Sequence, residues 1–106
     1  VVNAIRQTFP PQEWETAFLV AAAESSGDVN AVNAVTGDHG LFQINRGNFE
    51  ALSRILGVPI NEQTLRDPLL NARAARILWE RSQGWTPWAV KPNVFSYFAA
   101  RDAGRV

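Results

Sequence analysis

Two carboxyl groups of this chain stand in settings of opposite polarity. Glu24 directly follows an apolar run at residues 18–23, whereas Asp38 lies in a polar stretch that is rich in glycine and asparagine. Apolar surroundings raise the pKa of a carboxyl group, while polar surroundings leave it ionised. A protonated acid that faces a carboxylate can cleave a glycosidic bond, because one group protonates the leaving oxygen and the other stabilises the positive centre.

Both residues also have plainer interpretations. Glu24 can be a solvent-facing residue at a helix end, and Asp38 can be a turn former between Gly37 and Gly40, where aspartate is common. A helix dipole disfavours negative charge at the C-terminal end, so Glu24 is an unusual choice for a purely structural position. Asp28 is a rival second carboxylate, but its place soon after Glu24 is more typical of a turn.

Four polar residues near the two carboxyl groups are candidates for contacts with a substrate. Gln43 and Asn45 alternate with apolar positions, so both amides are expected to project into a cleft as donors and acceptors. His39 has the alternative of a packed loop histidine, and a serine behind Glu24 can bond backbone groups instead. The four candidates are Ser25, His39, Gln43 and Asn45.

Aromatic side chains late in the chain supply flat apolar faces of the kind that sugars stack on. Trp85 and Trp88 lie near Tyr97 in the sequence, and tryptophan packs in a core more often than in a binding site. Trp88 is compatible with both roles, because it could wall off Glu24 from water while facing a ligand. We take Trp88 and Tyr97 as candidate substrate contacts.

The composition indicates one packed domain over residues 1–106 and excludes several classes of function. The apolar fraction is 46% and there are four tryptophans, which is typical of a globule with a real core. Ten Lys and Arg residues balance ten Asp and Glu residues, so no broad basic surface for nucleic acid is expected. One histidine and no cysteine argue against a zinc site, and we expect no metal or other cofactor.

The sequence gives little direct information on where the domain acts or on the chain it comes from. No run of about 18 apolar residues is present, so no membrane span is predicted. The first residues lack the layout of a signal peptide, and the chain holds no methionine. We therefore expect a monomeric domain cut from a longer chain, with partner domains and any targeting signal outside this sequence.

Helical signals dominate, which predicts a mainly α (α+β) fold. We expect helices to pack around a central buried one that ends near Glu24, and a small loop or β-hairpin to form one wall of a cleft. Residues 41–45 are compatible with a short strand or a helical turn. The expected segments are helices at 1–9, 11–24, 48–56, 67–84 and 93–101, an irregular loop or hairpin at 26–40 and a rigid turn at 85–88.

Over residues 18–45 these motifs resemble the lysozyme-like superfamily, and more narrowly its phage and bacterial muramidase or lytic transglycosylase domains. The resemblance rests on a helix-terminal Glu-Ser pair, a loop with asparagine and alanine, and a Gly-Leu-x-Gln sequence. Here the motifs stand as Glu24-Ser25, Asn30-Ala31, Asn33, Gly37 and Gly40-Leu41-Phe42-Gln43. The segment 38–45 is also similar to the animal-type lysozymes, in which an aspartate precedes a Gln-Ile-Asn sequence.

The resemblance implies cleavage of the β-1,4 bond between N-acetylmuramic acid and N-acetylglucosamine in peptidoglycan. Glu24 would be the general acid and base, and Asp38 the second carboxylate. Many lytic transglycosylases manage with the glutamate alone and form an anhydro product, so this outcome stays open. A non-catalytic glycan-binding or structural domain on the same fold is the remaining alternative. The place of action would be the bacterial cell wall, reached by secretion, in the periplasm or by phage delivery.

Overall fold

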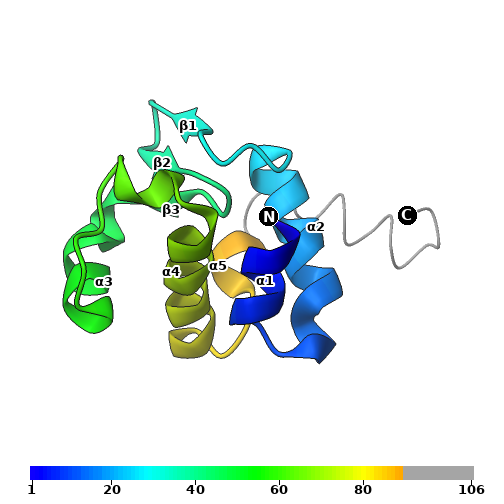
Figure 1. The fold of residues 1–106 in the computed structure, drawn as a ribbon. Helices are drawn as coiled ribbons and strands as arrows, with labels where there is room; N and C mark the ends of the chain where they lie inside the picture. Colours follow the sequence, from blue (N-terminus) through cyan, green and yellow to red (C-terminus); the bar gives the residue numbers. More distant parts are fainter. Residues whose placement is uncertain (90–106) are drawn as a thin grey trace.

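The computed structural model describes residues 1–89 of the chain, and a helical lobe and a small sheet meet in it (Figure 1). The helices are α1 (Val2–Thr8), α2 (Trp14–Ser25), α3 (Phe49–Leu56), α4 (Pro68–Arg81) and α5 (Thr86–Ala89). The strands are β1 (Val32–Asn33), β2 (Asp38–His39) and β3 (Ile44–Asn45). Short 3-10 helices cover Pro11–Glu13, Arg46–Asn48 and Thr64–Arg66. The expected mainly α fold with a small β excursion is therefore confirmed.

Two helix ends follow directly from local sequence signals. The side chain of Asp67 accepts a hydrogen bond from the backbone N–H of Leu69, and Pro68 occupies the first helical position of α4. Gly57 ends α3 with a φ of 70°, in the left-handed region that glycine adopts without steric cost. Helix α2 begins at Trp14 and not at Pro11, where the sequence predicted its start, because Pro11–Glu13 forms a 3-10 turn.

One expected segment is different in the structure, and another lies outside the described residues. The segment 85–88 was expected to be a rigid turn, but Thr86–Ala89 forms the helical turn α5. Pro87 is compatible with this helix because proline lacks only an N–H that the first turn leaves without a partner. The helix expected at residues 93–101 falls outside residues 1–89.

The three strands form an antiparallel sheet in the order β1-β2-β3. Asp38 pairs with Asn45 across β2 and β3, and His39 pairs with Ile44. Opposite residues of antiparallel strands point to the same face, and successive residues point to opposite faces. Asp38 and Asn45 therefore share one face of the sheet, and His39 and Ile44 share the other.

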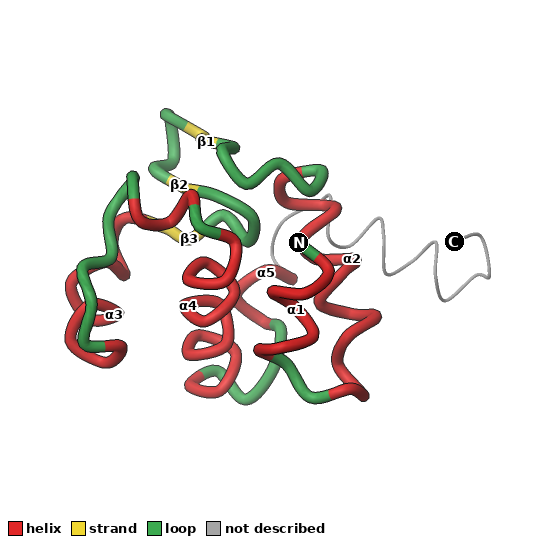
Figure 2. Tube along the Cα trace, viewed as in Figure 1, coloured by secondary structure: helices red, strands yellow, loops and turns green. Residues whose placement is uncertain are grey.

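Helix α4 lies between α3 on one side and α1 and α5 on the other (Figure 2). It contacts α1, α3 and α5, and its buried face includes Ala72, Ala74 and Ala75. Small side chains on this face let α1 pack closely against it. Helix α2 is buried along Ala17, Val20 and Ala21. Within residues 1–89, no helix has both the length and the apolar character needed to cross a bilayer.

Candidate active site

Glu24 is the penultimate residue of α2, where the chain leaves the helix abruptly. Its side chain is half-buried, and the carboxylate atom Oε2 is buried. Ser26 follows with a φ of 56° in the left-handed region, and its N–H donates to the carbonyl of Ala22. This turn holds the carboxyl group at the apolar end of the helix, where burial favours the protonated form of an acid.

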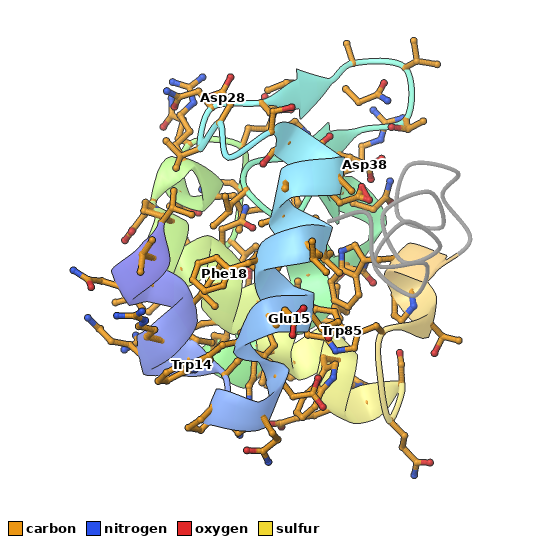
Figure 3. The ribbon with its side chains drawn as sticks, turned by 90° about the vertical axis from the view of Figure 1, so that its right-hand side faces the viewer. Trp14, Glu15, Phe18, Asp28, Asp38 and Trp85 are labelled. Carbon is orange, nitrogen blue, oxygen red and sulfur yellow. The ribbon has the colours of Figure 1, made fainter. Side chains whose placement is uncertain are left out.

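Asp38 is buried in β2, and side-chain donors hold both of its oxygens. The hydroxyl of Thr36 donates to Oδ2 over 2.6 Å, and Nδ2 of Asn45 donates to Oδ1 over 3.0 Å. Donors to a carboxylate favour the ionised form and fix its orientation. Figure 3 shows Asp38 and Asp28 on opposite sides of α2, with Asp38 on the side of α5. Asp38 is therefore buried among polar donors, whereas Glu24 is half-buried at the end of an apolar helix.

A cavity of about 120 Å³ opens between the sheet lobe and the helices. The sheet lobe contributes polar side chains to its lining, and the helical lobe contributes apolar ones. The hairpin thus forms one wall of a cleft, as the sequence suggested. The lining residues are Asp38, Gln43, Asn45, Asn48, Leu78, Pro87 and Trp88.

Gln43 and Asn45 line this cavity and also organise its polar wall. Nε2 of Gln43 donates to the carbonyls of Ala31 and Gly40, at 3.1 and 2.9 Å. Gln43 has a φ of 52°, which is costly for a residue other than glycine and depends on these bonds. The bond to Ala31 ties the loop that follows Glu24 to the turn that follows Asp38. It therefore links the two segments that carry the candidate carboxyl groups.

Trp88 serves both as a core residue and as part of the cavity wall. Its side chain is buried, and its Nε1 donates to the carbonyl of Phe42 over 2.9 Å. Its ring packs against Phe42 and against Trp85, whose own Nε1 donates to Glu13. The dual role considered for Trp88 is compatible with this position, and its donor is already engaged inside the protein.

The remaining predicted substrate contacts lie elsewhere. The hydroxyl of Ser25 donates to the carbonyl of Ala21 and accepts from the N–H of Gly27, so it stabilises the end of α2. His39 points to the face of the sheet opposite Asp38. Tyr97 lies outside the described residues. Glu24 and Ser25 are not part of the cavity lining that the described residues form.

Asn71 is a residue of the site that the sequence reasoning missed. It is fully buried in α4, and its Oδ1 accepts from the N–H of Phe42 over 2.8 Å. Its Nδ2 donates to the carbonyls of His39 and Leu65, both at 3.0 Å. The amide therefore fixes the backbone on both sides of Gly40, between Asp38 and Gln43. An asparagine on the alanine-lined face of an expected helix was the signal available in the sequence.

Asn48, Leu78 and Thr36 were also not anticipated. Asn48 and Leu78 line the cavity, and Thr36 holds Asp38. None of the three belongs to a recognisable motif, so only the folded structure brings them to the site. Within residues 1–89, no group of three or more His, Asp or Glu side chains is placed to hold a metal ion.

Comparison with known protein families assigns the chain to a family. A family model described as a lysozyme-like domain matches residues 2–90. The chain belongs to this lysozyme-like domain family. Its members are generally glycosidases or transglycosylases that act on peptidoglycan, so the coarse class of substrate is the bacterial cell wall. No curated protein and no solved structure matches the chain.

Proposed function

We propose that this lysozyme-like domain is a muramidase that cleaves the bond between N-acetylmuramic acid and N-acetylglucosamine. The observation that carries the proposal is the position of Glu24 at the end of α2, with its Oε2 atom buried. Burial keeps a carboxyl group protonated closer to neutral pH, as a general acid requires. Glu24 donates its proton to the leaving glycosidic oxygen.

Asp38 acts as the second carboxylate in this proposal. It lines the cavity, and its bonds from Thr36 and Asn45 favour the ionised form. An ionised carboxylate stabilises or captures the positive sugar carbon that develops when the bond breaks. Water then attacks that carbon, and Glu24 takes the proton of the water as general base.

The polar wall of the cavity would hold the sugar. Asn45 and Gln43 bring amides to the lining, and Trp88 closes the apolar side. The N–H groups of both amides already donate within the protein, so the amides would meet the hydroxyl and N-acetyl N–H groups of the substrate as acceptors, through their oxygens. Contacts from Ser25, His39 and Tyr97 remain predictions from the sequence.

A transglycosylase that uses Glu24 alone is the second candidate function. One observation favours it, because both oxygens of Asp38 already accept hydrogen bonds within the sheet lobe. Asp38 would then be a structural residue, and the 6-hydroxyl of the substrate would attack in place of water. The product is then an anhydro sugar, and no water is consumed. A domain that binds glycan without cleaving it is the third possibility.

Product analysis on purified peptidoglycan separates these functions. Mass spectrometry of the released fragments shows reducing ends after hydrolysis, and fragments lighter by one water after the anhydro route. The muramidase proposal expects reducing ends, and it expects Asp38→Asn to lower their rate of release strongly. Anhydro products, with Asp38→Asn as active as the parent, would establish the transglycosylase instead. Binding of glycan with no fragment released would leave the third possibility.

A further inference from the structure

A second hollow of about 460 Å³ lies near α3 and the loop that follows it. Two of its lining residues contact His39. The ring centroids of Phe49 and His39 are 5.5 Å apart, and Oε1 of Glu62 lies 3.9 Å from Nε2 of His39. Since His39 and Asp38 point to opposite faces of the sheet, this hollow is distinct from the candidate active site. It is lined by Arg46, Phe49, Asn61, Glu62 and Gln63.

This hollow is open, and its lining residues other than Phe49 are exposed. The side chain of Arg46 packs over Gly37, where an added Cβ would come within 2.8 Å of the arginine Cδ. On the other side, Oδ1 of Asn61 accepts from the N–H groups of Gln63 and Thr64, both at 2.9 Å. The charged groups of this open hollow are therefore accessible to a ligand from solvent.

The charges in the hollow indicate the class of ligand. Arg46 and Glu62 both line it, yet the ion pairs found within residues 1–89 do not include a bond between them. Arg46 has no carboxylate partner among the described residues. A cation and an anion that share one hollow without pairing suit a ligand that carries both charges. Phe49 adds an apolar face between the polar groups, which suits an alkyl side chain.

We propose that this hollow binds the stem peptide of peptidoglycan, a short peptide that carries carboxylates and an amine. The proposal rests on the proposed function, because it takes peptidoglycan as the substrate. Arg46 binds a carboxylate of the peptide in the planar geometry that guanidinium favours, and Glu62 binds its amine. The N-acetyl sugars of the glycan carry no amine, so Glu62 has no charged partner in an unsubstituted glycan.

Direct binding of a free stem tetrapeptide tests the proposal without catalysis. Titration followed by NMR or calorimetry should show saturable binding by the domain. Arg46→Gln and Glu62→Gln should each weaken binding about tenfold, since each removes a charge-assisted hydrogen bond. Arg54→Gln is the matched control, because Arg54 is exposed on α3 and pairs with Glu50 outside the hollow. Its affinity should equal that of the parent.

Cleavage assays then show whether the hollow binds the peptide or the glycan part of peptidoglycan. Arg46→Gln should lower the rate on intact peptidoglycan, and it should leave the rate unchanged on glycan strands stripped of their peptides. An equal loss on both substrates would overturn the proposal in favour of a glycan subsite. The absence of saturable peptide binding, or an equal loss in Arg54→Gln, would also overturn it. Failure of the proposed function itself appears separately, as a parent domain that releases no fragments.

Discussion

The contact between Gly40 and Asn71 predicts a large effect of a single added methyl group. A Cβ at Gly40 would lie 2.2 Å from Nδ2 of Asn71 and 2.5 Å from the carbonyl oxygen of Leu65. Neither neighbour can yield cheaply, because Asn71 is fully buried and the carbonyl belongs to the backbone. Gly40→Ala must therefore displace the amide that fixes the turn between Asp38 and Gln43.

The magnitude follows from two separate costs. Gly40 has a φ of 76°, and a residue with a Cβ pays about 1–2 kcal/mol in this left-handed region. Displacing Asn71 weakens its three hydrogen bonds, each worth about 1 kcal/mol. The free energy of unfolding should fall by about 4–5 kcal/mol, which is a large share of the roughly 5–15 kcal/mol of a typical domain.

Gly27→Ala is the matched control, because Gly27 has a φ of 78° and an added Cβ would meet nothing within 4 Å. Gly27→Ala has only the cost of the left-handed backbone. The free energies of unfolding of the two variants in urea should therefore differ by about 3 kcal/mol. The gap corresponds to roughly 10–20 °C in melting temperature. Equal stabilities for the two variants would refute the idea that Asn71 clamps this turn.

Two further changes test how the polar wall is held. Thr36→Val removes a donor to the carboxylate of Asp38, so the pKa of Asp38 should rise. The acidic limb of the pH–rate profile should then move to higher pH. On acidification, the stability that ionised Asp38 contributes should also be lost at a higher pH than in the parent. An acidic limb that does not move would contradict a catalytic role of Asp38. Trp88→Phe leaves the carbonyl of Phe42 without its indole donor and should cost about 1–3 kcal/mol of stability and lower the release of fragments. Trp14→Phe loses a similar bond outside the cavity, so it should lower stability alone, and equal losses of activity would contradict a role for Trp88 in the cavity.

Local signals predicted much of the fold because they act over one helical turn. The cap of Asp67 and the left-handed Gly57 each satisfy backbone groups next to them in the chain, so their effect can be recognised from sequence. The turn expected at residues 85–88 was wrong for a related reason. Residues 85–88 were expected to form a rigid turn, although proline is tolerated in the first turn of a helix, where α5 places Pro87.

Part of the cavity lining could be predicted from the continuous segment 38–45, which supplies Asp38, Gln43 and Asn45, and Trp88 was a separate aromatic candidate. Asp38 and Asn45 could be recognised from one continuous motif, and strand pairing places them together. Asn71 could not, because its bond to Phe42 joins segments 29 residues apart in sequence. His39 shows the opposite problem, since adjacency to Asp38 in sequence puts its side chain on the other face of the sheet.

The proposed cleavage depends most on the proton carried by Glu24, and one pair of variants measures this dependence. Glu24→Gln keeps the shape of the side chain and removes the acid, whereas Glu15→Gln makes the same change at an exposed position of α2. Fragments released from purified peptidoglycan should fall at least about a hundredfold in Glu24→Gln, as expected for loss of a general acid, and stay at the parent level in Glu15→Gln. Release at the parent rate by a folded Glu24→Gln variant would show that Glu24 is not the general acid.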